Sequence, residues 1–145
     1  MSYGYKKGYN PQKYAENRKA EKERTYQMID DTAIEVSRSP DKLKEFLAVQ
    51  AKFDMYSAAN TLLIFKQMPN ATQLKSFDDW NKDGIQVRQK QKSIAILEPV
   101  EYTKSDGTPG LGYNVKRVFD RSQTNSKREA VQKTDDLKHT LKNFV

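Results

Sequence analysis

Apolar residues recur at helical spacing in the first half of the chain. Residues 14–37 predict one helix, whose second half bears a single apolar face at Tyr26, Ile29, Ala33 and Val36. Ser39 and Pro40 then predict a helix start, because serine caps a helix and proline lacks only an N–H that the first turn leaves unused. This second helix is predicted to run to about Met55, with an apolar stripe at Leu43, Phe46, Leu47 and Ala51 that Val49 and Phe53 widen.

Two shorter helices are predicted next. Ser57 precedes an almost wholly apolar helix from Ala58 to about Gln67, and a short helix of this kind is usually buried on most sides. Ser76 followed by Asp79 resembles a capping box, which predicts a further helix over residues 77–83 with a stop at Gly84. That helix carries Trp80, the only tryptophan of the chain.

The hydrophobic pattern changes to alternation after Gly84. Ile85–Arg88 predicts a short strand, and residues 94–102 and 111–119 predict two longer ones, joined by a turn rich in glycine and proline. The helices come first and the strands second, so the predicted fold class is α+β. Its architecture is a set of N-terminal helices packed on a small antiparallel sheet, made of a hairpin at about 94–120 and the short third strand.

Polar segments flank this predicted core. Residues 1–13 consist largely of Tyr, Gly and Lys, which predicts a flexible basic tail. Residues 125–145 predict a loosely ordered C-terminal tail. The remaining residues, 14–124, are predicted to form a single domain, as the length of 145 residues also suggests.

Charge and composition narrow the classes of function. The net charge of +7 favours polyanionic partners, of which nucleic acid is the commonest, although a soluble protein can also simply be basic. The absence of cysteine excludes disulfides, thiol catalysis and cysteine-ligated metals. The longest strongly apolar run, Thr61–Phe65, is too short to span a bilayer, and the N-terminus lacks an apolar signal core. We therefore predict a cytoplasmic protein without a membrane partner.

Residues suited to catalysis are scarce. His139 is the only histidine, so an ordinary zinc site cannot be built without cysteine. The acidic pairs Asp30–Asp31, Asp78–Asp79 and Asp135–Asp136 are sequence neighbours, which on a helix point about 100° apart and do not converge on a substrate. We therefore predict no enzymatic activity, no catalytic residue, no metal and no cofactor.

Basic and aromatic side chains concentrate in residues 80–121. Basic groups neutralise phosphates, and exposed rings stack unpaired bases, each worth roughly 1–3 kcal/mol. A sheet that carries both predicts a surface for single-stranded DNA; the alternative is that Trp80 is core and the lysines are ordinary surface residues. The candidate DNA-binding residues in this region are Trp80, Lys82, Arg88, Lys90, Lys92, Tyr102, Tyr113, Lys116 and Arg117.

Tyr56 and Asn60 are two further candidates for DNA binding, outside that region. Asn60 is polar at the start of an apolar helix, where a buried amide needs hydrogen-bond partners. It either contacts a base or phosphate, or ties its helix to a neighbouring loop, and the sequence leaves both interpretations open.

Short motifs follow one another in a characteristic order over residues 43–124. They are Phe46–Gln50, Tyr56–Ser57, Asn60, Leu62–Ile64, Pro69–Thr72, Phe77, Trp80, Lys82, Gly84, Val87–Arg88, Lys92, Ile94–Leu97, Val118–Asp120 and Ser122–Thr124. In order and spacing this set resembles the N-terminal domain of ArdC-type antirestriction proteins, which are carried by conjugative plasmids and transposons. One departure is the turn at residues 89–93, where Gln-Lys-Gln-Lys-Ser replaces the usual Lys-Gly-Glu-Lys-Gly and both glycines are lost.

The resemblance implies sequence-nonspecific binding of single-stranded DNA, in antirestriction or in conjugative transfer of a mobile element. It also implies, as a partner, a metallopeptidase-like domain in a longer parent protein. Two other functions compete with this hypothesis. One is a non-enzymatic protein-interaction adaptor of a conjugation or phage system, and the other is a fragment of an enzyme whose ligands lie outside this chain.

Overall fold

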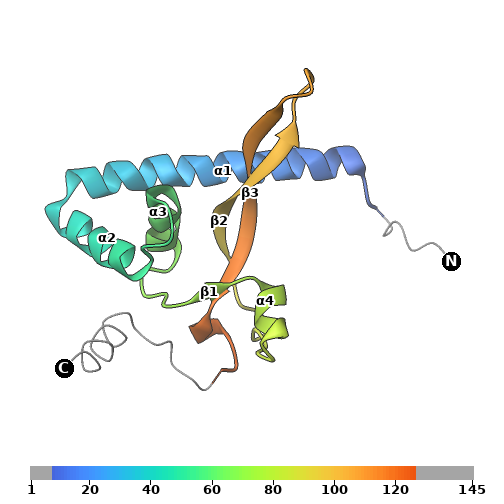
Figure 1. The fold of residues 1–145 in the computed structure, drawn as a ribbon. Coiled ribbons are helices and arrows are strands. Elements are labelled where there is room, and N and C mark those ends of the chain that lie inside the picture. The colour runs from blue at the N-terminus through green and yellow to red at the C-terminus, as the bar shows by residue number, and fades with distance from the viewer. Residues whose placement is uncertain (1–7, 127–145) are drawn as a thin grey trace, which may run out of the picture.

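The computed structural model describes residues 8–126. Four helices and a three-stranded antiparallel sheet confirm the predicted α+β class (Figure 1). The elements, in chain order, are α1 (Pro11–Arg38), α2 (Pro40–Lys52), α3 (Ala58–Gln67), β1 (Leu74–Lys75), α4 (Phe77–Lys82), β2 (Ile94–Thr103), β3 (Pro109–Asp120) and a 3₁₀ turn (Arg121–Gln123).

Side-chain caps set where the helices begin. The hydroxyls of Ser39, Ser57 and Ser76 each accept a backbone N–H from the first turn of the helix that follows, at 3.2–3.3 Å, as the sequence predicted. Asn10 caps α1 in the same way, through the N–H groups of Gln12 and Lys13. Residues 11–13 are therefore helical, and the predicted N-terminal tail is wrong for them; residues 127–145, most of the predicted C-terminal tail, lie outside the described residues.

The third strand is not the predicted one. The sheet order is β1-β3-β2, and β1 pairs Leu74 with Asp120 and Lys75 with Phe119. Ile85–Arg88 instead forms only an isolated bridge, between Val87 and Thr124. The physical reason is that the N–H of Arg88 donates to the carbonyl of Gln123, so this segment runs beside the chain that follows β3 and not beside the sheet.

The main core lies where the three long helices meet the lower half of the hairpin. In α2 the buried residue is Val49, and the C-cap residue Phe53 is buried beside it, whereas Leu43 and Leu47 of the predicted stripe are 43% and 55% exposed. The face of α2 that meets the core is therefore rotated from the predicted face by about 100°, which is the angle between neighbouring helix residues. The core cluster consists of Val36, Val49, Phe53, Ile64, Phe65, Ala71, Leu74, Ile94, Ile96 and Val118.

Helix α1 buries two threonines that the hydrophobic pattern did not indicate. The hydroxyls of Thr25 and Thr32 donate to the carbonyls of Glu21 and Met28, one helical turn earlier. Because each hydroxyl has a partner on its own helix, it can be buried without an unsatisfied polar group.

Helix α3 is joined to the free edge of β2 by two side-chain amides. Gln67 exchanges a pair of hydrogen bonds with the backbone N–H and C=O of Ala95, both at 2.9 Å. Asn60 does the same with Leu97, at 2.9 and 2.8 Å. The two amides occupy the backbone positions that a further strand would use, and they fix the helix against the sheet.

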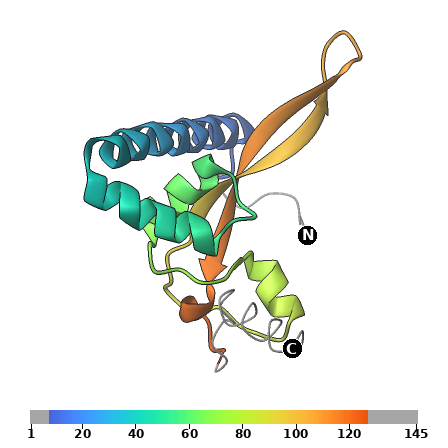
Figure 2. The same cartoon turned by 60° about the vertical axis from the view of Figure 1, so that its left-hand side comes forward.

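The overall arrangement leaves half of the hairpin without a helical cover. Figures 1 and 2 show the three long helices beside the lower half of β2 and β3, while the distal half projects away from them. β1 and α4 form a small lower lobe at the other end of β3. Within residues 8–126, no helix combines the length and the apolar character that crossing a membrane requires.

Candidate nucleic-acid interface

The pairing register divides the hairpin residues between two faces. Ile96 lies opposite Lys116, and Tyr102 lies opposite Gly110; because residues two apart share a face, all of these lie on one face. Tyr113 and Arg117 lie on the other face. We call the first one the groove face, defined by Ile96, Glu98, Tyr102, Gly110, Gly112 and Lys116.

Tyr102 forms a flat aromatic surface on the distal part of the groove face. Its ring packs on the backbone of Gly110, where an added Cβ would lie 2.6 Å from the ring, and it also approaches Gly112. The side chain is nevertheless 52% exposed. One ring face therefore rests on glycine backbone while the opposite face is open to solvent, as stacking of a nucleobase requires.

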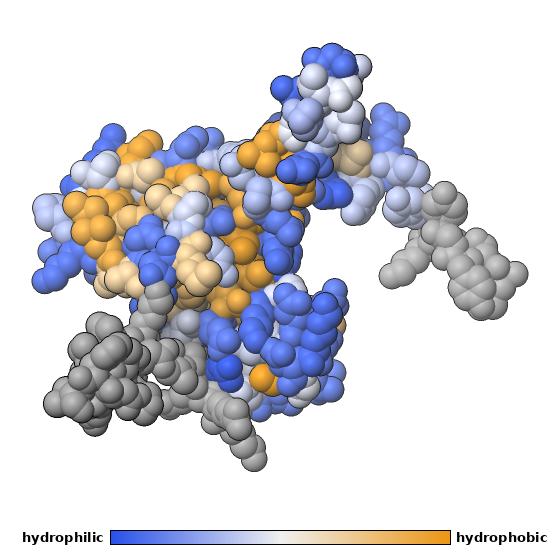
Figure 3. Space-filling view, viewed as in Figure 1, coloured by the Kyte–Doolittle hydropathy of each residue, from blue (hydrophilic) through white to orange (hydrophobic). Residues whose placement is uncertain are grey.

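A pocket opens at the other end of the groove face. It has a volume of about 280 Å³ and lies between the hairpin, α3 and the lower lobe. In Figure 3 the surface is hollowed between the hairpin and the hydrophilic region over β1 and α4. The lining residues are Tyr56, Asn60, Leu74, Lys75, Ser76, Asp79, Ile96, Leu97, Glu98, Pro99, Lys116 and Val118.

Tyr56 is held in place at one side of this pocket. Its ring meets that of Phe53 edge-on, at a centroid distance of 5.7 Å, and the amide of Gln50 donates to its backbone carbonyl. Burial raises the pKa of the Tyr56 phenol above its ordinary value. The hydroxyl is therefore neutral at physiological pH and can both donate and accept a hydrogen bond.

Asn60 lines the pocket, but its amide is already engaged. Both polar atoms of the side chain bond to the backbone of Leu97 in β2. A direct contact to a base or phosphate stays a prediction, which would use the second N–H or the second lone pair of the amide. The hydrogen bonds show that the amide ties its helix to its surroundings, with a strand in place of the expected loop.

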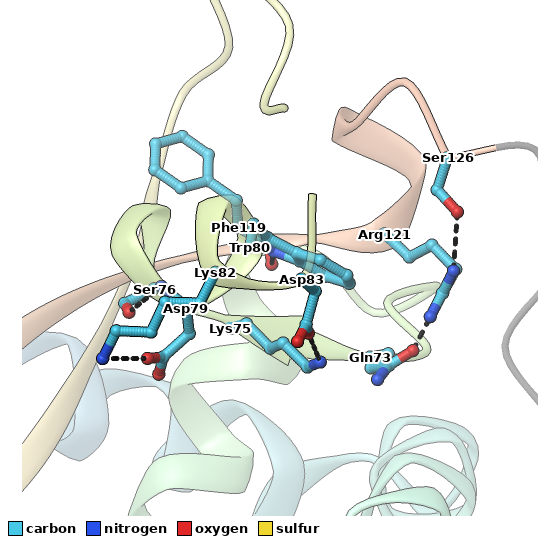
Figure 4. Close-up of polar contacts among 10 residues, drawn as sticks. All are labelled: Gln73, Lys75, Ser76, Asp79, Trp80, Lys82, Asp83, Phe119, Arg121 and Ser126. Carbon is cyan, nitrogen blue, oxygen red and sulfur yellow. Dashed lines mark hydrogen bonds and ion pairs between the residues drawn. The ribbon is translucent and has the colours of Figure 1, made fainter. Parts of the chain in front are cut away.

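Trp80 is completely buried, so the prediction that its ring stacks on a base is wrong. The indole N–H donates to the carbonyl of Phe119 at 2.9 Å. Lys75 Nζ and Arg121 Cζ lie 5.0 and 5.3 Å from the ring centroid, and Lys75 also pairs with Asp83 (Figure 4). The indole is thus the core of the lower lobe, which is the alternative that the sequence left open.

The predicted basic residues do not form one surface. Lys116 lines the pocket. Lys82 does not line it, but its ammonium lies 3.8 Å from the carboxylate of Asp79, which does. Arg117 lies on the opposite face of the hairpin, paired with Glu21 of α1 at 3.2 Å.

Arg88, Lys90 and Lys92 belong to a separate loop. The guanidinium of Arg88 donates to the carbonyl of Ser122, and Lys92 lines a different pocket, with Lys66. Lys90 has a φ of 63°, so it adopts the left-handed conformation at the place where the resembling family carries a glycine. The turn thus tolerates the loss of this glycine.

Of the eleven predicted residues, Tyr102 and Lys116 lie on the groove face, and Tyr56 and Asn60 line the pocket at its end. Four further residues of the pocket were not recognisable from the sequence. Ser76 carried a signal only as a helix cap, and nothing in the pattern distinguished the charged residues from ordinary surface ones, because they come together only in the tertiary fold. The four are Lys75, Ser76, Asp79 and Glu98.

In the described part of the chain, no three His, Cys, Asp or Glu side chains gather in a way that could hold a metal ion. His139 lies outside the described residues.

One comparison with known proteins gives a match. The family model described as the N-terminal domain of anti-restriction factor ArdC matches residues 18–144, which is nearly the whole chain. No curated protein and no solved structure matches it significantly.

Proposed function

Because the chain belongs to the family of N-terminal domains of the anti-restriction factor ArdC, we propose that it binds single-stranded DNA along the groove face, largely without sequence preference. Membership implies a function related to antirestriction; strand binding, with a role in antirestriction or conjugative transfer, is the step we add. The observation that carries it is the open ring of Tyr102 on the same face as Lys116 and the pocket. We propose no catalytic role.

The groove face suits an unpaired strand better than a duplex. Tyr102 lies six positions after Ile96 in β2, which corresponds to about 20 Å of extended chain. Over that length a cation at the pocket can contact phosphates while an open ring stacks a base. Bases of a single strand are free to stack on aromatic rings, whereas those of a duplex are already stacked on one another.

Replacement of Tyr102 by alanine is expected to weaken strand binding by about 5- to 150-fold, which corresponds to the roughly 1–3 kcal/mol of one stacked base. Tyr113→Ala is the matched control, because Tyr113 is 42% exposed on the opposite face of the same hairpin. Fluorescence anisotropy with labelled oligo-dT measures both variants. Equal losses in the two variants would show that the groove face is not the binding face.

Replacement of Lys116 by glutamate is expected to weaken strand binding and to make the affinity depend less steeply on salt concentration. Loss of one phosphate contact lowers the slope of log K against log salt by about 0.7 for a single strand. Lys44→Glu makes the same change in net charge on α2, away from the groove face, and is the control. Titrations at several salt concentrations distinguish them: if both variants lose the same affinity, only the overall charge matters and Lys116 is not a contact.

A second candidate function is protein docking, and exposed apolar residues of α1 and α2 favour it. Ile34, Leu43 and Leu47 are 47%, 43% and 55% exposed. The partner we propose for this surface is a metallopeptidase-like domain of a longer parent protein. Binding to such a domain that survives nuclease treatment and is lost in Leu43→Glu and Leu47→Glu variants, without any shift of an oligonucleotide, would favour this function over strand binding.

A further inference from the structure

We propose that the pocket at the base of the groove face receives one base of the bound strand and prefers a base with an amino group, guanine above all, over thymine. This inference rests on the proposed function, because it assigns a ligand group to one part of the same surface. The proposed function has largely no sequence preference, and the inference adds a preference at one position only, the nucleotide whose base enters the pocket.

The interior of the pocket suits a flat apolar ring. Ile96 and Val118 of the hairpin and Leu74 of β1 line it, and all three are buried in the core. Tyr56 bounds one side with an aromatic ring. The volume of about 280 Å³ lies near the lower limit of ordinary small-molecule sites, so the pocket fits a single base and not a larger group.

The rim carries both kinds of polar group: the hydroxyls of Tyr56 and Ser76 can donate, and the carboxylates of Asp79 and Glu98 accept. Asp79 of α4 and Glu98 of β2 are exposed carboxylates that line the pocket. The Lys75 ammonium is directed to Asp83 and to the ring of Trp80. Lys116 is the cation that we assign to the phosphate backbone. An ionised carboxylate can only accept hydrogen bonds. Lys82 Nζ lies 3.8 Å from Asp79 Oδ1, beyond hydrogen-bonding distance, so both carboxylates keep oxygens that can accept from the edge of a base.

The four bases differ in what they present to such acceptors. Guanine carries two adjacent donors, its ring N–H and its amino group, which match the two oxygens of one carboxylate. Cytosine and adenine present one amino group, and a carboxylate accepting from the cytosine amino group is a known mode of base readout. Thymine presents carbonyl oxygens on both sides of its single N–H, and these repel a carboxylate. We therefore expect the pocket to bind guanine most tightly and thymine most weakly.

The position of the pocket connects it to the proposed path of the strand. Lys116, at its rim, lies on the same hairpin face as the stacking ring of Tyr102. A strand that runs along this face from Tyr102 reaches the pocket after about 20 Å of hairpin. One base can then turn into the pocket while its neighbours remain on the open surface.

The test compares a 12-mer of thymidine with 12-mers in which one central thymidine is replaced by dG, dC or dA. We expect the full chain to bind the dG-containing strand about 5- to 10-fold more tightly than the all-thymidine strand, at the low end of readout by one side chain because the rim is exposed. Asp79→Asn and Glu98→Gln variants are expected to reduce this ratio toward one. The same variants should bind the all-thymidine strand more tightly, because a repulsive charge is removed.

Two control variants separate base readout from a general effect of charge. The controls are Asp78→Asn, next to Asp79 on α4, and Glu101→Gln, on β2 with Glu98. Neither Asp78 nor Glu101 lines the pocket. Both should raise the affinity for all four strands alike and leave the ratio unchanged. A ratio of one in the parent protein, or an equal loss of ratio in the control variants, would overturn the inference while strand binding stands. Absence of binding to all four strands would instead overturn the proposed function.

Discussion

Replacement of Trp80 by alanine is expected to reduce the free energy of unfolding by about 3–5 kcal/mol, the cost typical of truncating a large buried aromatic residue. Trp80 is completely buried and is the largest such side chain in the described structure. Its indole N–H holds α4 to the carbonyl of Phe119, and two cationic side chains lie over its ring. The variant loses all of these contacts at once and leaves a cavity between α4 and β3. Urea denaturation followed by circular dichroism measures the change.

Phe77→Ala is the matched control for this experiment. Phe77 lies three residues earlier on the same helix, but it is 51% exposed. Its removal should therefore cost much less stability than that of Trp80. If Trp80→Ala instead left the protein as stable as the parent and weakened only DNA binding, the indole would act as a base-stacking ring after all.

The opposite positions of Phe77 and Trp80 show what the sequence could and could not predict. Spacing placed both on one short helix, and the Ser76 cap fixed where that helix begins. Which of the two is buried depends on β3, whose end meets α4 through the carbonyl of Phe119. That contact joins residues 39 positions apart, and a local pattern does not contain it.

The same distinction applies to the sheet and to the groove face. Alternation predicted the hairpin but not its register, so Tyr102 and Lys116 were grouped with Tyr113 and Arg117, which the pairing places on the opposite face. β1 is only two residues long, too short for alternation to be recognised, and so Ile85–Arg88 was predicted in its place. Lys75 lies on β1 and was missed for the same reason, whereas Asp79 lies on a helix that was predicted and was missed because its place at the pocket depends on tertiary contacts.

Replacement of Asp120 by asparagine is expected to lower the free energy of unfolding by about 2–4 kcal/mol at neutral pH, because a buried, charged acceptor loses part of its hydrogen bonding. The carboxylate is 1% exposed and accepts from the N–H groups of Thr72 and Gln73 with one oxygen and from the N–H and hydroxyl of Ser122 with the other. An asparagine can keep the first pair, but its NH₂ group then faces two donors.

The pH dependence follows from how the carboxyl group titrates. Burial alone would raise the pKa of Asp120, but the hydrogen bonds from Ser122, Gln73 and Thr72 outweigh it and lower the pKa below its ordinary value. A group with a lowered pKa stabilises the fold fully above its pKa in the unfolded chain, about 3.9, and loses that contribution as the pH falls through the folded value. The stability difference between the parent and Asp120→Asn should thus be constant from pH 5 to 8 and shrink below about pH 4.

Asp30→Asn, on the exposed surface of α1, is the control for this titration. Its stability should follow that of the parent throughout. A difference between parent and Asp120→Asn that persists undiminished at pH 2 would mean that the loss comes from the shape of the side chain and not from its charge. Because Asp120 fixes the turn from Ala71 to β1 against the end of β3, its protonation loosens the same junction that forms one wall of the pocket.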